Sequence, residues 1–390
     1  MRSIAVIGKN FGDEGKGLVT ADLCFMNGKS LVVKHNGGAQ AGHTVESADG
    51  RFVHHQIASG AEFKAVTLWA GTYTPDLYAL GKEIEEFAQI FNRIPVIFAE
   101  PETKITTIDD VLLNMAVETG RGDKRHGSCG MGIDECRTRG LAGYSLTVKE
   151  VKANDGEWIL RKLTDIRKAY TRKRISELGI RDDNEYLELL DDDDLLRGYA
   201  LQIKAGSKYV SLTNADAKWL EGFDCVVFES GQGLLLDEDL VKYAPHLTSS
   251  KTGIQNPVLF MQRRKLQLDE AIYVTRTYVT RHGAGPLPCE CGKENLGIAA
   301  DDETNRPNEW QGTIRYAKHE NPETFLEAVK EDAKCFDGDK SICLTHLDET
   351  KEMIIFDGIY LDVEELKREI GPFVSKVYKA ERFVNGLKVI

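Results

Sequence analysis

The sequence predicts an α/β protein with a large, mostly parallel central sheet flanked by helices. Short, continuously apolar segments rich in β-branched residues alternate with segments whose apolar residues recur at helical spacing. Strands that read as unbroken apolar runs are buried on both faces, and strands separated by helices pair in parallel. The first apolar segment also runs into a glycine-rich turn and a helix, an arrangement typical of phosphate-binding α/β proteins.

The expected strands, in chain order, are residues 4–7, 30–34, 66–70, 95–98, 224–228, 271–275, 341–344 and 353–356. The expected helices between them are residues 82–91, 158–178, 322–334 and 363–370. Asp362 precedes the last helix and Glu365 follows three positions later, which is the pattern of a capping box.

We expect a single domain over residues 1–390, with an inserted helical lobe at 104–215. No internal repeat, low-complexity linker or composition shift marks a boundary in the chain. The net charge of −12 argues against nucleic-acid binding, which requires clustered positive charge. No apolar run approaches the roughly 20 residues of a membrane helix. The chain starts directly with a strand, so we expect a cytoplasmic protein with reduced cysteines.

Residues 8–17 read Gly-Lys-Asn-Phe-Gly-Asp-Glu-Gly-Lys-Gly and connect the first strand to a helix. Backbone N–H groups of such a turn cradle a phosphate, and Lys16 adds a positive charge, so we expect a fold like that of the P-loop NTPases. The stretch is not a Walker A loop, because Asn10 and Gly17 occupy the positions of a required glycine and Ser/Thr. Asp13 and Glu14 place carboxylates inside the cradle, which calls for a cation such as Mg²⁺, or for one of them to take a proton from a second substrate.

Two further residues are expected to bind the nucleotide. His43 lies in a second glycine-rich loop, where a ring N–H can stabilise the charge of a transferring phosphoryl group. Asp348 follows the expected strand 341–344, where its carboxylate can accept both N1–H and N2–H of guanine. Adenine has no donor at N1, so Asp348 favours GTP over ATP as the nucleotide.

Four motifs together resemble those of the adenylosuccinate synthetase family. They are Gly-Asp-Glu-Gly-Lys-Gly at 12–17, Gly-Gly-Ala-Gln-Ala-Gly-His-Thr at 37–44, Glu-Ser-Gly-Gln-Gly at 229–233 and Thr-Arg-His-Gly-Ala-Gly-Pro-Leu-Pro at 280–288. The resemblance implies a ligase in which the Asp13 carboxylate removes the N1 proton of a 6-oxopurine and binds Mg²⁺ together with the Gly42 carbonyl. It also implies a nucleotide site made by Gly12, Gly15, Lys16, Gly17, Gly42, His43, Thr44 and Asp348, with Asp13, His43 and Lys16 as the catalytic residues.

The same resemblance implies a site for a purine nucleoside monophosphate. Its loop corresponds to Ser128 and Cys129, and its remaining contacts to Gln40, Gln232 and Thr248. In the family an arginine lent by the partner subunit of a homodimer completes the site. Arg137 or Arg139 stands at that position, and Arg139 is our choice. Cys129 lacks the hydroxyl of the family's threonine, and Gln40 is one methylene longer than the family's asparagine.

The loop for L-aspartate departs most from the family pattern Thr-Thr-Gly-Arg-x-Arg. Here it reads Glu-Thr-Asn-Arg-Pro-Asn at 303–308. Thr304 and Arg306 remain, and the arginine fork suits a carboxylate. Asn308 replaces the second arginine.

These departures leave the acceptor open. The leading hypothesis is GTP-driven conversion of IMP and L-aspartate to adenylosuccinate, GDP and phosphate. The alternative is the viral-type reaction, in which dGMP is the acceptor and GTP or ATP the donor, giving 2-amino-2′-deoxyadenylosuccinate for diaminopurine DNA. A more remote alternative is a GTP-binding switch protein.

Overall fold

The computed structural model describes residues 1–122, 126–298 and 312–390. Its centre is a ten-stranded sheet. The strand order is β17 (Lys388–Val389), β16 (Lys376–Lys379), β13 (Asp339–Thr345), β9 (Glu270–Arg276), β1 (Arg2–Gly8), β8 (Cys225–Gly233), β2 (Ser30–Lys34), β5 (Val66–Trp69), β6 (Ile97–Ala99) and β7 (Val210–Leu212). All neighbours pair in parallel except β16 and β17, so the predicted large, mostly parallel sheet is confirmed.

Seven of the expected strands correspond to β1, β2, β5, β6, β8, β9 and β13 of this sheet. The eighth is confirmed as a strand but lies outside this sheet. Residues 353–356 form β14 (Ile354–Phe356), which pairs antiparallel with β15 (Ile359–Leu361) in a separate hairpin. Two further small sheets are the hairpin of β3 (His43–Ser47) and β4 (Gly50–His54), and a sheet of β10 (Val279–His282), β11 (Glu290–Cys291) and β12 (Ile314–Ala317).

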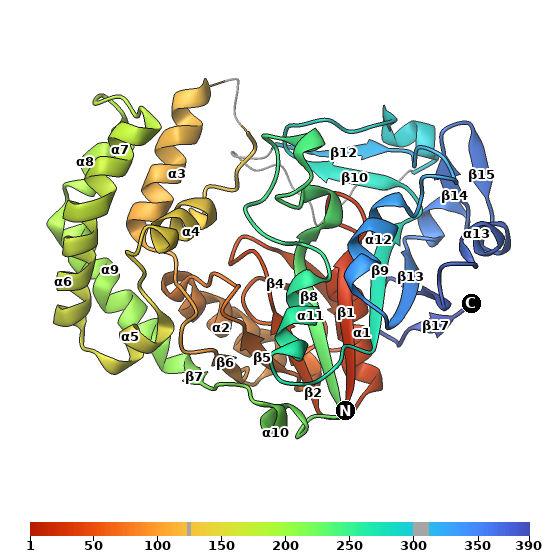
Figure 1. Cartoon of the computed structure of the whole chain (residues 1–390), viewed down its shortest axis with the longest axis horizontal. Coiled ribbons are helices and arrows are strands. Elements are labelled where there is room, and N and C mark those ends of the chain that lie inside the picture. Colours follow the sequence, from red (N-terminus) through yellow and green to blue (C-terminus); the bar gives the residue numbers. More distant parts are fainter. Residues whose placement is uncertain (123–125, 299–311) are drawn as a thin grey trace.

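Helices cover both faces of the sheet (Figure 1). On one face α1 (Lys16–Met26) packs Leu18 and Val19 against Ile4 and Val6 of β1. The alternate β1 residues, Ala5 and Ile7, belong to the core on the opposite face, which α11 (Gln255–Gln262) and α12 (Glu327–Asp332) cover. Since side chains alternate along a strand, burial on both faces explains the unbroken apolar sequence of β1.

A second group of helices lies between β6 and β7 in the chain and to one side of the sheet (Figure 1). They are α3 (Ile108–Arg121), α4 (Ile133–Leu141), α5 (Val148–Ala153), α6 (Gly156–Ile166), α7 (Arg172–Leu178), α8 (Glu185–Leu190) and α9 (Asp193–Gly206). A π-helical segment, Arg167–Thr171, joins α6 to α7, so the helix expected at 158–178 is one continuous rod. Helix α9 packs against α6 and against α2 (Leu77–Phe91), within one apolar cluster that also contains Trp69 of β5.

The C-terminal helix α13 (Val363–Ile370) has the expected bounds and capping box, with Asp362 accepting from the Glu365 N–H at 2.8 Å. The helix expected at 322–334 is shorter, because only Glu327–Asp332 is α-helical. None of the helices in the described parts of the chain combines the length and the apolar character that a membrane crossing needs.

The start of α1 approaches β3 so closely that only glycine fits at position 17. A Cβ added there would lie 2.6 Å from the His43 Cβ and 3.0 Å from the Ser59 Oγ. This contact gives a structural reason for glycine where a Walker A loop has a hydroxyl residue.

We therefore predict that Gly17→Ala lowers the free energy of unfolding by about 1–3 kcal/mol, the usual cost of overpacking a core. Gly81→Ala in α2 is the matched control, since its Cβ would meet nothing within 4 Å. It should raise the stability by about 0.5–1 kcal/mol, because alanine is the better helix former. Urea unfolding of both variants tests this, and equal stability of Gly17→Ala and wild type would contradict the packing argument.

Candidate functional site

The predicted strand, glycine-rich turn and helix are present as β1, residues 9–15 and α1. Gly12 and Gly15 have φ values of 109° and 91°, and Asp13 adopts φ 61°. Residues other than glycine rarely adopt this left-handed conformation, so contacts with neighbouring residues must hold Asp13 in it. The Thr280 Oγ1 donates to the Gly12 carbonyl at 3.1 Å, and the Arg276 guanidinium donates to the Asp13 carbonyl.

Inside the turn, the Glu14 carboxylate accepts the hydrogen bonds that a phosphate was expected to accept. Its Oε1 accepts from the N–H groups of Asn10 and Gly12 at 3.0 and 2.8 Å, and its Oε2 lies 2.7 Å from the Lys16 Nζ. Burial disfavours the charged carboxylate, but Lys16 and these N–H groups outweigh it and lower the pKa of Glu14. An incoming phosphate therefore competes with Glu14 for the same positive partners.

Asp13 sits at the open side of this turn, with a side chain about one-fifth exposed. One of its carboxylate oxygens lies 3.4 Å from the His282 Nε2. The carboxylate is thus free on one side to meet a ligand, which suits either acceptance of a proton or coordination of a cation.

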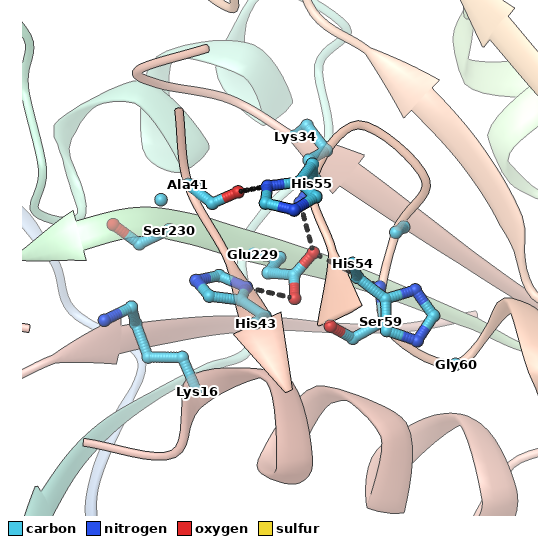
Figure 2. Close-up of polar contacts among 12 residues, drawn as sticks. Lys16, Lys34, Ala41, His43, His54, His55, Ser59, Gly60, Glu229 and Ser230 are labelled. Carbon is cyan, nitrogen blue, oxygen red and sulfur yellow. Dashed lines mark hydrogen bonds and ion pairs between the residues drawn. The ribbon is translucent and has the colours of Figure 1, made fainter. Parts of the chain in front are cut away.

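His43 is anchored by a buried carboxylate (Figure 2). Its Nδ1 lies 2.7 Å from the Glu229 Oε1, while the Glu229 Oε2 lies 3.1 Å from the Lys34 Nζ. Burial lowers the pKa of His43, and the effects of Lys34 and Lys16 act in the same direction against that of Glu229. Despite its own burial, the pKa of Glu229 is well below its ordinary value because of Lys34 and His43.

An ionised carboxylate only accepts hydrogen bonds, so the His43 Nδ1 carries the proton that points to Glu229. The Nε2 atom is buried and has no hydrogen-bond partner in the described structure. It faces the side on which Lys16 lies (Figure 2). The arrangement fixes the ring and leaves one nitrogen available to a ligand beside Lys16.

The expected monophosphate residues Gln232 and Gln40 come together at a loop of residues 36–40. The Asn36 Nδ2 donates to the Gln232 Oε1 at 3.2 Å, and a Cβ on Gly37 would lie 2.6 Å from that oxygen. A Cβ on Gly38 would lie 3.1 Å from the Gln40 Oε1, which is buried with no hydrogen-bond partner among the described residues. Both amides therefore lie beside this loop.

Two other expected segments reach the same loop. The Gly37 N–H donates to the Ser250 Oγ at 3.1 Å, which brings the segment of Thr248 alongside. Helix α4, which follows Ser128 and Cys129, places its Ile133 side chain against Gly38. Burial raises the pKa of the Cys129 thiol to about 11, so this cysteine stays protonated and is no nucleophile.

Arg139 does not fit the role of an arginine lent to a partner subunit. It is 1% exposed, and its guanidinium forms a bidentate pair with Asp110, with both N–O distances 2.8 Å. It also donates to the carbonyls of Ile105 and Tyr144 within its own chain. Arg137 is the exposed alternative; its side chain is 42% exposed and pairs with Glu238.

The structure places the remaining expected residues as follows. Asp348 is exposed in a turn after β13, and the Thr345 Oγ1 of that strand donates to the Glu14 carbonyl at 2.8 Å. Gly42 immediately precedes β3, and Thr44 follows His43 in it. Thr304 and Arg306 lie outside the described residues. In the described chain no three His, Cys, Asp or Glu side chains cluster as a metal site, but Asp13 and the Gly42 carbonyl offer the oxygen ligands that Mg²⁺ prefers.

Sequence reasoning gave no role to Glu229 or Lys34, and it did not predict that Glu14 bonds to its own turn. Glu229 and Lys34 each end an otherwise apolar strand segment in the centre of the sheet, and a charge at such a position is the signal that identifies a buried pair. Glu14 gave no comparable signal, because only the geometry shows that its carboxylate turns back into its own loop.

The family model for adenylosuccinate synthetase matches residues 5–354. The adenylosuccinate synthetase of Thermosipho africanus is 30% identical over 304 residues, covering 76% of this chain and 69% of the relative. That of Azobacteroides pseudotrichonymphae is 26% identical over 391 residues, covering 97% and 87%.

Two solved structures share the fold. A fully ligated adenylosuccinate synthetase from Plasmodium falciparum superimposes with a TM-score of 0.72 at 18% identity, covering all of both chains. The succinoaminodeoxyadenylate synthetase PurZ of cyanophage S-2L, bound to dGMP and dATP, superimposes with a TM-score of 0.63 at 13% identity, covering 100% of this chain and 95% of PurZ.

The buried Arg139–Asp110 pair predicts that Arg139→Met lowers the free energy of unfolding by about 3–5 kcal/mol, because it leaves Asp110 buried without its partner. Arg137→Met is the control and should change stability by about 1 kcal/mol or less. Denaturant unfolding measures both. If Arg139→Met retained wild-type stability, Arg139 would again be a candidate for the partner's site.

Proposed function

This chain belongs to the adenylosuccinate synthetase family of carbon–nitrogen ligases, and we propose that it joins L-aspartate to C6 of a purine nucleoside 5′-monophosphate, driven by GTP. The observation that carries the proposal is the placement of three groups around one turn: the partly exposed Asp13 carboxylate, the Lys16 ammonium and the anchored His43 ring. These are the groups that phosphorylation of a 6-oxopurine requires. The family assignment argues against a GTP switch protein.

In the first step, the Asp13 carboxylate takes the N1 proton of the 6-oxopurine. The C6 oxygen thereby becomes nucleophilic and attacks the γ-phosphorus of GTP, and GDP leaves. Lys16 and the turn N–H groups neutralise charge on the phosphates once Glu14 gives way. The negative γ-phosphoryl group favours protonation of the His43 Nε2, which then donates a hydrogen bond to it.

The Asp13 carboxylate and the Gly42 carbonyl would hold Mg²⁺, which would supply further positive charge to the phosphates. In the second step, the amino group of L-aspartate attacks C6 and inorganic phosphate leaves with the former C6 oxygen. We assign Thr304 and Arg306 to the aspartate carboxylates, following the family pattern.

For the nucleoside monophosphate, we assign Ser128, Cys129, Gln232 and Thr248, together with Arg137 of a second subunit in a homodimer. The exposure of Arg137 supports this choice over Arg139. For the donor base, the exposed Asp348 beyond β13 supports GTP, since its carboxylate matches the N1–H and N2–H of guanine.

IMP is the proposed acceptor, and dGMP is the second candidate. None of Asp13, Gln232 and Thr248 is assigned a contact with C2 of the purine, where IMP carries hydrogen and dGMP an amine. The buried Gln40 Oε1 without a partner is the specific observation that favours dGMP, because it is an acceptor for that amine. PurZ, which shares the fold, was solved with dGMP and dATP, so ATP-type donors belong in the test.

The acceptor prediction is that kcat/KM is higher for IMP than for dGMP, with Mg²⁺ and L-aspartate held constant and GTP as donor, and a parallel series uses ATP and dATP. Gln40→Met should leave the IMP value nearly unchanged, since IMP offers no C2 donor to Gln40. With dGMP the same variant should lose activity by about tenfold, the cost of an unpaired buried amine. A wild-type preference for dGMP of about tenfold or more would assign the enzyme to the diaminopurine reaction.

The catalytic prediction is that Asp13→Asn lowers kcat by about 10²–10⁴-fold, because an amide cannot accept the N1 proton. Binding of the nucleotide and the thermal unfolding midpoint should stay close to wild type. Asp49→Asn, at an exposed position in the β3–β4 turn, is the control and should keep full activity. Activity of Asp13→Asn within a few fold of wild type would remove Asp13 from the mechanism.

A further inference from the structure

A separate cavity lies beside the start of the glycine-rich turn. Its volume is about 280 Å³, and its apolar wall is formed by Phe11, Leu235, Leu240, Tyr243, Val279 and Phe325. The Phe11 and Tyr243 rings meet edge to face with centroids 5.0 Å apart, so this wall is well packed. Lys9 is the buried cation of the lining, being 6% exposed.

The cavity lies on the side of the sheet that α12 covers, opposite to α1. A Cβ on Gly8 would lie 2.8 Å from the Lys16 Nζ, so position 8 faces the start of α1. Lys9 follows at a bend, where its N–H donates to the Val274 carbonyl at 2.8 Å. Its ammonium lies over the ring of Phe325, a residue of the core on the face covered by α11 and α12.

The Lys9 ammonium has no carboxylate partner within ion-pair distance in the described parts of the chain. Its contacts are the Asn10 Oδ1 at 3.2 Å and the Phe325 ring, whose centroid lies 3.9 Å away. Lys318, which also lines the cavity, pairs with Asp357 at 3.2 Å. Burial lowers the pKa of Lys9 to about 7, against the opposing effect of Glu14 and Glu320. A buried ammonium without an anion is costly, and an anion in the cavity would remove that cost.

We propose that this cavity binds a small organic monocarboxylate, whose carboxylate pairs with Lys9 and whose apolar body packs against Phe11, Tyr243 and Phe325. The proposal is independent of the purine reaction, since none of these residues is assigned to it. The volume lies just below the range for ligand cavities, about 300–1,000 Å³, and therefore suits a small metabolite rather than a nucleotide.

The charges around the cavity select a monoanion over phosphate. Glu320, Glu327 and Glu331 line it and are exposed at its mouth, where they repel a dianion about twice as strongly as a monoanion. The apolar wall offers nothing to the additional oxygens of a phosphate. An aromatic or aliphatic monocarboxylate can pair with the single buried cation and pack its apolar body against the apolar wall.

The test is calorimetric titration of the whole protein, free of nucleotides, with benzoate, phenylacetate and 3-phenylpropionate as probes. Benzamide is the neutral control and inorganic phosphate the dianion control. We expect at least one carboxylate to bind, with affinity lowered about tenfold or more in Lys9→Met through loss of a charged contact. Lys242→Met, at an exposed lining residue, should change the affinity much less.

A pH series provides a second readout. Only the protonated ammonium attracts a carboxylate, so wild-type affinity should fall between about pH 6 and about pH 8, while Lys9→Met should show a flat profile. His319 does not mimic this, because burial keeps its pKa well below its ordinary value. Lys9→Met keeps all the other ionisable groups near the cavity, so its profile reports their contribution. These groups are Glu14, Lys242, Lys318, His319, Glu320, Glu327 and Glu331.

Lys9→Met removes a buried charge without an ion-pair partner, so its thermal unfolding midpoint should equal or exceed that of wild type. This control separates loss of the site from loss of the fold. The proposal is overturned if none of the three carboxylates binds wild type, if Lys9→Met binds them equally well, or if phosphate binds more tightly than the carboxylates.

Discussion

The candidate site depends on one buried carboxylate, that of Glu229. It is fully desolvated in the middle of β8, and it pairs with Lys34 at the end of the neighbouring β2 and with His43 of β3. A lone charge in this interior would be too costly, so the three side chains are stable only together. Because β8 lies between β1 and β2, the same strand fixes the histidine relative to the phosphate turn. The close contact of Gly17 with His43 completes this placement from the side of α1.

Glu14 adds a second constraint, which concerns the shape of the turn. Its carboxylate binds the N–H groups of the turn and Lys16 and so holds the turn in place. The same contacts must be exchanged when a nucleotide binds. A preformed turn lowers the entropy cost of ordering the turn when the nucleotide binds. The displacement of Glu14, in contrast, costs free energy and weakens nucleotide binding. Asp13, which precedes Glu14, has a strained backbone conformation. Hydrogen bonds from Arg276 to the Asp13 carbonyl and from Thr280 to the Gly12 carbonyl hold it in place.

The sequence predicted the parallel sheet well, because strands buried on both faces are unbroken apolar runs. It also predicted the strand at residues 353–356, but a short apolar run does not reveal which sheet the strand joins. Arg139 shows the limit of motif alignment: an arginine at a plausible position was in fact the buried partner of Asp110, which lies 29 residues away in the chain. The pairing of Glu229 with His43 spans 186 residues and follows from the strand order, which local patterns do not contain. The turn of Asp13 and Lys16 was predictable because strand, turn and helix are consecutive.

The central claim is that the site activates the C6 oxygen of a purine by phosphorylation, and the fate of that oxygen tests it directly. A purine nucleoside monophosphate labelled with oxygen-18 at C6 would be converted with GTP, Mg²⁺ and L-aspartate, and the released phosphate analysed by mass spectrometry. The proposed mechanism predicts one labelled oxygen in each inorganic phosphate formed. Label found in water, or phosphate released without label while the succinyl product forms, would contradict the mechanism.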